Sequence, residues 1–150
     1  VFAATAAANG EDTITGFTAG SDADKLDFKA FLGGAAGEIA TATAALGTAK
    51  LDLTGKNVGV TAKSDGKIGS GDIAISSTGN DKVVIADNGK AVVLVVKADN
   101  LTTSGDVNLY YVQDTNAATN AQTWDVQLVG TLTSNSTTKI TGGFDSSNFA

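Results

Sequence analysis

Residues 91–96 form an unbroken apolar run, AVVLVV, and this run most constrains how the chain can fold. Side chains of a β-strand alternate between two faces, so a strand that is apolar at every position must be covered on both. The run is far shorter than the roughly 20 residues that a helix needs to span a bilayer. We therefore expect residues 92–96 to form a central strand inside layered β structure, and we expect no membrane insertion.

Further segments of strand character follow one another from residue 51 onward. Residues typical of hairpin turns, Gly, Asn, Asp and Ser, separate them. The Asn88-Gly89 pair is the clearest of these signals, and it predicts a hairpin between residues 82–86 and 91–98. The expected strands are 51–53, 58–63, 72–77, 82–86, 91–98, 107–114, 124–132 and 137–141.

Only residues 29–47 have helical character. Their apolar positions recur at roughly helical spacing, although Gly33 and Gly34 weaken the start, and Gly47 is suited to cap the end. The predicted fold class is mainly β: an antiparallel β-sandwich or compact barrel with one short helix near residues 29–47. The length of 150 residues suits a single domain, 1–150.

The chain contains no Cys, His, Met or Pro, and all of its cationic side chains are lysines. It therefore lacks the usual general base, any thiol nucleophile and the usual ligands for transition metals. Glycoside hydrolysis by paired carboxylates would need a cleft with aromatic platforms, and the chain has one Trp and two Tyr. We expect no enzymatic activity.

The formal net charge is −6 and the isoelectric point is about 4.3. This balance argues against binding to nucleic acid or to anionic membrane surfaces, which attract clustered cations. It suits hard cations, which take oxygen ligands. Mild acidity also aids solubility, so the net charge alone does not distinguish cation binding from simple solubility.

Acidic residues gather at a turn between two short apolar segments near the start of the chain. Asp12, Asp22, Asp24 and Asp27 lie there beside glycines that expose backbone carbonyls. A turn that offers both carboxylates and carbonyls can supply the six to eight oxygens that calcium takes. Ordinary Asx-turns would use the same residues, so the sequence leaves two interpretations open: a calcium site and a set of turn aspartates.

A second acidic loop is flanked by Asp65 and Asp72. We interpret it as a plain hairpin loop.

This segment resembles the closing turn of RTX-type proteins, which bacteria export by type I secretion, including surface-layer proteins. The family pattern places an Asp, β-branched residues, a Phe and a Gly-x-Asp before a Lys-hydrophobic-Asp-hydrophobic strand. Gly16 stands where the family commonly has a second Asp, and Ala23 and Asp24 lengthen the loop. The matching residues are Asp12, Ile14, Phe17, Gly20, Asp22, Lys25, Leu26, Asp27 and Phe28.

The resemblance implies calcium as a cofactor, held by Asp12, Asp22, Asp24 and Asp27. It also implies an extracellular or cell-surface location, with the type I export machinery and either a second copy or a surface polysaccharide as partners. Residues 1–33 would be the RTX-like closing turn, and residues 34–150 a β-rich body whose end, about 131–150, carries an export signal. Because the chain opens at Val1, we expect a C-terminal fragment of a longer protein.

One alternative function is a purely structural subunit that self-associates through a sheet edge. The other is a carbohydrate- or surface-binding β-sandwich of a secreted enzyme or adhesin. Trp124, Tyr110 and Tyr111 would form its sugar-binding patch. Exposure of these aromatics on one face would favour that alternative, and burial would count against it.

Overall fold

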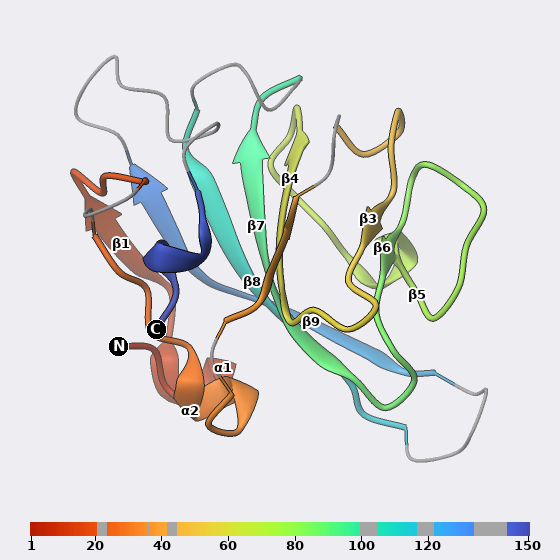
Figure 1. The fold of residues 1–150 in the computed structure, drawn as a ribbon, viewed down its shortest axis with the longest axis horizontal. Helices are drawn as coiled ribbons and strands as arrows, with labels where there is room; N and C mark the ends of the chain where they lie inside the picture. Colours follow the sequence, from red (N-terminus) through yellow and green to blue (C-terminus); the bar gives the residue numbers. More distant parts are fainter. Residues whose placement is uncertain (21–23, 36, 42–44, 100–104, 117–121, 134–143) are drawn as a thin grey trace.

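A computed structural model of the chain has two β-sheets and two short helices, which confirms the mainly β, sandwich-like prediction (Figure 1). The expected strand at 137–141 lies outside the described residues. The structure describes residues 1–20, 24–35, 37–41, 45–99, 105–116, 122–133 and 144–150.

The larger sheet has six strands in the order β1-β9-β8-β7-β4-β2. Among the described strands of this sheet, β7–β8 and β8–β9 pair antiparallel and the other pairs are parallel, so the predicted antiparallel pairing holds for only part of the sheet. The strands are β1 (Asp12–Thr15), β2 (Ile39–Thr41), β4 (Val58–Lys63), β7 (Lys90–Lys97), β8 (Val107–Asp114) and β9 (Trp124–Thr133).

The smaller sheet explains why parallel strands occur. It contains β3 (Leu51–Asp52), β6 (Val83–Val84) and β5 (Ile73–Ala74), which pair parallel in the order β3-β6-β5. Parallel strands need a long crossover connection. The connection from β2 to β4 passes through β3, and the connection from β4 to β7 passes through the short 3₁₀ turn η1 (Ser70–Asp72), β5 and β6, so the small sheet is the crossover layer.

The predicted hairpin between residues 82–86 and 91–98 is therefore wrong. Asn88 does adopt a positive φ of 55°, and the Gly89 amide donates to the Ala86 carbonyl. The turn carries the chain from the small sheet into the large one, because β6 pairs with β3 and β5 while β7 pairs with β4 and β8.

The central strand β7 is covered on both faces, as the sequence predicts. Every residue from Val92 to Val96 is 0% exposed. Val92, Leu94 and Val96 contribute to one hydrophobic cluster, which we call the aromatic cluster, and the intervening Val93 and Val95 contribute to a second cluster beneath the small sheet. The alternation of side chains along one strand thus builds two cores.

All six phenylalanines belong to or pack against the aromatic cluster. The Phe31 ring stacks on Tyr111 at a centroid distance of 3.8 Å, and the Phe28 ring lies 4.7 Å from Phe2. The helices α1 (Ala6–Asn9) and α2 (Lys29–Leu32) lie on this side of the sheet together with both termini (Figure 1).

The predicted helix within residues 29–47 exists but is only four residues long. Gly33 follows it with φ 75° and ψ 31°, a left-handed cap, and Gly34 also has a positive φ. Two such residues in succession turn the chain away, and Ile39–Thr41 instead adds strand β2 to the sheet. No helix in the described residues is long and apolar enough to cross a membrane.

Gly59 lets the two sheets approach. A Cβ at this position would lie 2.5 Å from Leu51 Cδ2 and 2.9 Å from Leu53 Cδ2. We expect Gly59→Ala to lower the free energy of unfolding by about 1–3 kcal/mol through overpacking. The matched control is Gly69→Ala, whose Cβ would meet nothing within 4 Å and which should change stability by less than about 0.5 kcal/mol. Urea denaturation of both variants measures the difference, and equal effects would contradict this account of the packing.

Candidate functional site

The acidic turn lies between β1 and α2, beside the C-terminal residues. Asp12 is the first residue of β1 and is exposed, and the pairing of β1 with β9 fixes its backbone. Asp22 lies outside the described residues. Asp24 lines a shallow hollow of about 300 Å³ together with Lys25 and residues of β1 and its following turn.

Two of the predicted ligands accept backbone hydrogen bonds in the manner of turn aspartates. Asp24 Oδ2 accepts the Thr18 amide at 2.9 Å, and Asp27 Oδ1 accepts the Lys29 amide at 3.0 Å. These bonds close the local turns of the segment. In the described part of the chain, no three acidic side chains lie together in a way that could hold a metal ion.

The buried side chain of Asn148 holds both ends of the loop that contains Asp22. Its Oδ1 accepts the Gly20 amide at 3.0 Å, and its Nδ2 donates to the carbonyls of Gly20 at 3.1 Å and Asp24 at 2.9 Å. Oδ1 also accepts the Asp145 amide at 3.1 Å. The side chain is 0% exposed, so these four bonds satisfy an amide that would otherwise be costly to bury.

The backbone around Asn148 completes this contact, which we call the C-terminal clasp (residues 145–150 against 20–26). The Leu26 amide donates to the Asn148 carbonyl at 2.7 Å, and the Ala150 amide donates to the Leu26 carbonyl at 3.1 Å. Leu26 and Phe149 form a parallel bridge. Phe149 also stacks near Phe28 in the aromatic cluster, at 6.4 Å between ring centroids. The described ends of the acidic turn and the last residues of the chain are therefore in direct contact.

Asp145 shapes the clasp from its other end. Hydrogen bonds from the Ser147 hydroxyl and from the Ser147 amide hold the pKa of the Asp145 carboxyl below its ordinary value. The same bonds cap the 3₁₀ turn η2 (Ser146–Asn148), which presents Asn148 to the loop. An ionised Asp145 thus favours the conformation that the clasp needs.

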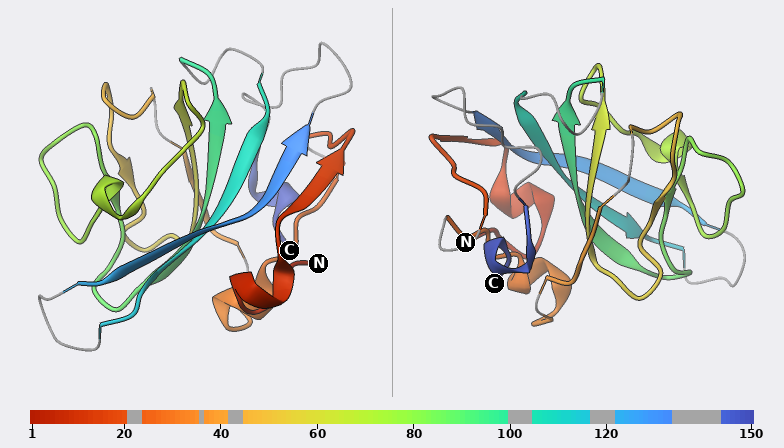
Figure 2. Two further views of the ribbon diagram at one scale, coloured as in Figure 1. Left: turned by 180° about the vertical axis from the view of Figure 1, so that it is seen from behind. Right: turned by 45° about the horizontal axis from the view of Figure 1, so that its top comes forward.

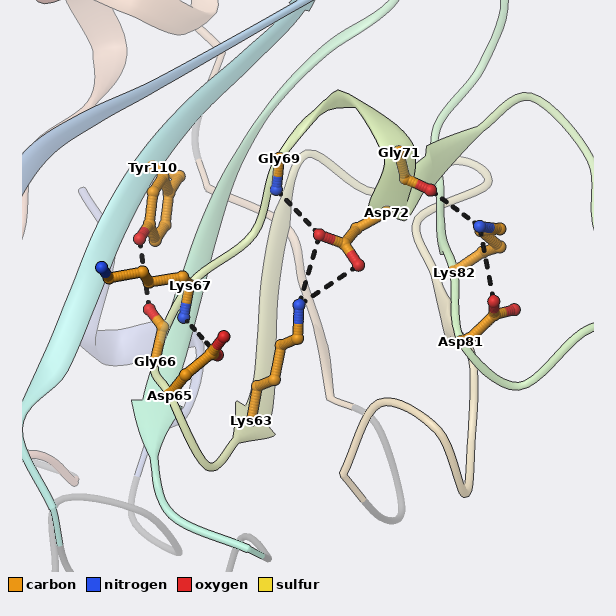
Figure 3. A network of polar contacts seen from close by, with 10 residues as sticks. All are labelled: Lys63, Asp65, Gly66, Lys67, Gly69, Gly71, Asp72, Asp81, Lys82 and Tyr110. Carbon is orange, nitrogen blue, oxygen red and sulfur yellow. Dashed lines mark hydrogen bonds and ion pairs between the residues drawn. The ribbon is translucent and has the colours of Figure 1, made fainter.

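The second acidic loop, flanked by Asp65 and Asp72, is engaged in structural contacts (Figure 3). Asp72 accepts the Gly69 amide at 2.8 Å and pairs with Lys63 Nζ at 3.3 Å, while Asp65 accepts the Lys67 amide at 2.9 Å. It is a plain loop as predicted, but it links β4 to the small sheet and does not form a hairpin.

The three aromatics of the expected sugar-binding patch do not gather on an exposed face. Tyr110 and Tyr111 are buried on opposite faces of β8, one in each hydrophobic cluster, and Trp124 packs half-buried beside Tyr110's cluster. Burial raises the pKa of Tyr111 to about 12, and the nearby charge of Asp27 adds to this. The Tyr111 hydroxyl donates to the Ala3 carbonyl at 2.7 Å.

Sequence reasoning missed the role of Asn148, although a signal was present. The spacing of Asp145 and Asn148 is that of a capping box, in which each side chain bonds the backbone of the other end of the turn.

Comparison with protein-family models, curated proteins and solved structures gives no significant match. The site therefore stands on its geometry alone.

Removing the Asn148 amide should loosen the clasp. We expect Asn148→Ala to lower the free energy of unfolding by about 3 kcal/mol, because the Gly20 and Asp24 backbone groups lose buried partners. The melting temperature should fall by roughly 6–12 °C. Asn148→Asp keeps the acceptor but not the donor, so it should be at least as damaging. Thermal melts that match the wild type for both variants would contradict the assigned role.

The clasp should also weaken in acid. A carboxyl whose pKa is lowered by folding stabilises the protein above its unfolded pKa of about 3.9, and this stabilisation disappears as pH falls through the folded pKa. We expect the wild type to lose more melting temperature between pH 7 and pH 3 than Asp145→Asn does. Identical acid dependence in melts across that range would contradict the contribution of Asp145.

Proposed function

We propose that this chain is a non-enzymatic C-terminal domain of a type I secreted bacterial surface-layer or extracellular protein. In this role it serves secretion and calcium-dependent folding or assembly. The observation that carries the proposal is the clasp: one buried side chain, Asn148, anchors Gly20 and Asp24, the two residues that bracket the acidic loop. Ligands held at both ends of a short loop lose less conformational entropy when they bind an ion.

In this proposal, closure of the clasp couples folding of the domain to its secretion. Asn148 and Phe149 are buried in the folded domain, so an exporter that reads residues 131–150 would have to read them before folding. Carboxylate repulsion in the acidic turn would oppose the clasp while calcium is scarce. Calcium outside the cell would neutralise the turn and let the clasp close.

The expected energies are modest. Calcium modules of extracellular proteins bind at roughly 10⁻⁴ to 10⁻³ M. At about 1 mM calcium, a site of about 10⁻⁴ M adds only about 1.4 kcal/mol to stability. One such site shifts the folding equilibrium of a domain that is only marginally stable. A strong calcium-dependent switch would need several sites.

The alternative, a carbohydrate-binding β-sandwich, has less support. Its three expected contact aromatics are buried or half-buried in two separate clusters. A sugar platform needs an exposed ring face, and the burial of Tyr110 and Tyr111 counts against this alternative.

Calorimetric titration of EDTA-treated protein with CaCl₂ tests the proposal. We expect saturable binding in the range of about 10⁻⁴ to 10⁻³ M and, for a site at the tight end of that range, a rise in melting temperature of roughly 3–6 °C at 1 mM calcium. Asp22→Ala and Asp27→Ala should weaken the binding. Asp65→Ala, in the second acidic loop, is the matched control and should leave it unchanged. Absence of heat and of any shift up to about 10 mM would end the calcium proposal.

A further inference from the structure

Strand β9 continues well beyond the strand that covers its outer edge (Figure 2, left). The edge strand β1 pairs only with residues Gly130 to Thr133 of β9. The first half of β9, residues 124–128, pairs with β8 on its inner side. On its outer side no strand of the described part of the chain pairs with it, and within those residues this edge of the large sheet is uncovered.

The hydrogen bonds around β8 show which backbone groups face that open edge. The Thr115 amide donates to the Thr123 carbonyl at 2.9 Å, and the Asp114 amide points the other way, to Gly89. In an antiparallel ladder these directions alternate from residue to residue. Counted along β9, the N–H and C=O groups of Asp125 and Gln127 therefore face β8, and those of Trp124, Val126 and Leu128 face outward.

A groove of about 560 Å³ runs beside this edge. The start of the chain forms its wall, through Thr5 to Ala7, Gly10 and Glu11, and Asp125, Gln127 and Leu128 form its floor. Asn9 Nδ2 donates to the Val129 carbonyl at 2.7 Å and so closes the edge where the groove ends. The open stretch is thus five residues long, Trp124 to Leu128.

Natural sheet edges are usually protected by lysine, proline or very short strands. The opposite edge of the sheet follows that rule, because β2 has only three residues. Residues 124–128, Trp-Asp-Val-Gln-Leu, contain neither lysine nor proline; their one charged residue is Asp125, and the register shift of the ladder lies past their end, opposite Leu109 and Tyr110. Among the described residues, this stretch therefore keeps backbone groups that can pair with another strand.

We propose that a second copy of this chain pairs here, antiparallel, through a twofold axis at Val126. The segment is complementary to itself in that register. Trp124 faces the partner's Leu128, Val126 faces the partner's Val126, and these are the residues whose backbone groups point outward. On the opposite, exposed face, Asp125 lies opposite the partner's Gln127. Within each copy the Gln127 side-chain amide already donates to Asp125 Oδ1 at 2.6 Å, and the pairing places the same donor and acceptor within reach across the axis. An isologous contact of this kind closes as a dimer.

The contact is weak because the paired surface is small. Five residues a side bury much less than the roughly 1,200 Å² of a stable complex, and the charge of −6 on each copy opposes association. Pairing should therefore strengthen with added salt and matter where copies are held close together. Pairing of two copies would be one form of the assembly role proposed above. Only the biological use of the pairing rests on that proposed function.

Cysteine cross-linking tests the register, since the chain has no native cysteine. In the proposed pair, positions 125 and 127 of the two copies are directly opposite in a non-hydrogen-bonded pair, with Cα atoms about 4.5 Å apart. Two copies of position 125 are diagonal neighbours at about 7–8 Å, beyond the usual reach of a disulfide. Mixing Asp125→Cys with Gln127→Cys under mild oxidation should therefore give at least about tenfold more disulfide dimer than either variant alone.

Matched substitutions at the twofold axis complete the test. Val126→Pro in both cysteine variants removes the outward N–H but no bond to β8, so it should leave the fold intact and abolish the cross-link. Val126→Ala keeps the N–H and should keep the cross-link. Equal dimer yields in mixed and unmixed samples, or a cross-link that survives Val126→Pro in protein with a normal melt, would overturn the proposal. The reactions are run in EDTA, so failure of the calcium proposal and failure of this one are distinguishable.

Discussion

The two-sided burial of β7 is the constraint on which the rest of the structure depends. A strand that is apolar at every position cannot stand at a surface, so the sheet around it must be covered twice. The aromatic cluster covers one face, and the three-stranded sheet covers the other. Because the second cover is made from the connections between β2, β4 and β7, the same requirement makes those strands parallel.

The aromatic cluster in turn links the two ends of the chain. Phe2, Phe28 and Phe149 meet in it, and this places the buried amide of Asn148 against the acidic loop. Asparagine suits this position because the loop presents both amides and carbonyls, and only a side chain with an acceptor and a donor satisfies both. The candidate site is therefore a product of core packing as much as of its own polar residues.

Much of the strand pattern was predictable from local sequence. Strands β4 and β8 begin and end where the alternation and the turn residues indicated. The helix prediction extended too far, because helical spacing of apolar residues outweighed two glycines that take left-handed conformations. The Asn88-Gly89 turn was found, but the partner of the strand before it was not. A turn signal reports how the chain bends and does not report which strands become neighbours.

By itself, the sequence determined that the protein is β-rich, that its central strand is buried on both faces, and that acidic residues gather in one turn. These properties follow from side-chain periodicity and composition, which act locally. Tertiary structure decided the parallel crossovers, the clasp between Asn148 and the loop 128 residues earlier, and the stretch of β9 that no described strand covers. Each of these depends on which distant segments pack together, and that choice is made by the summed burial of the whole chain.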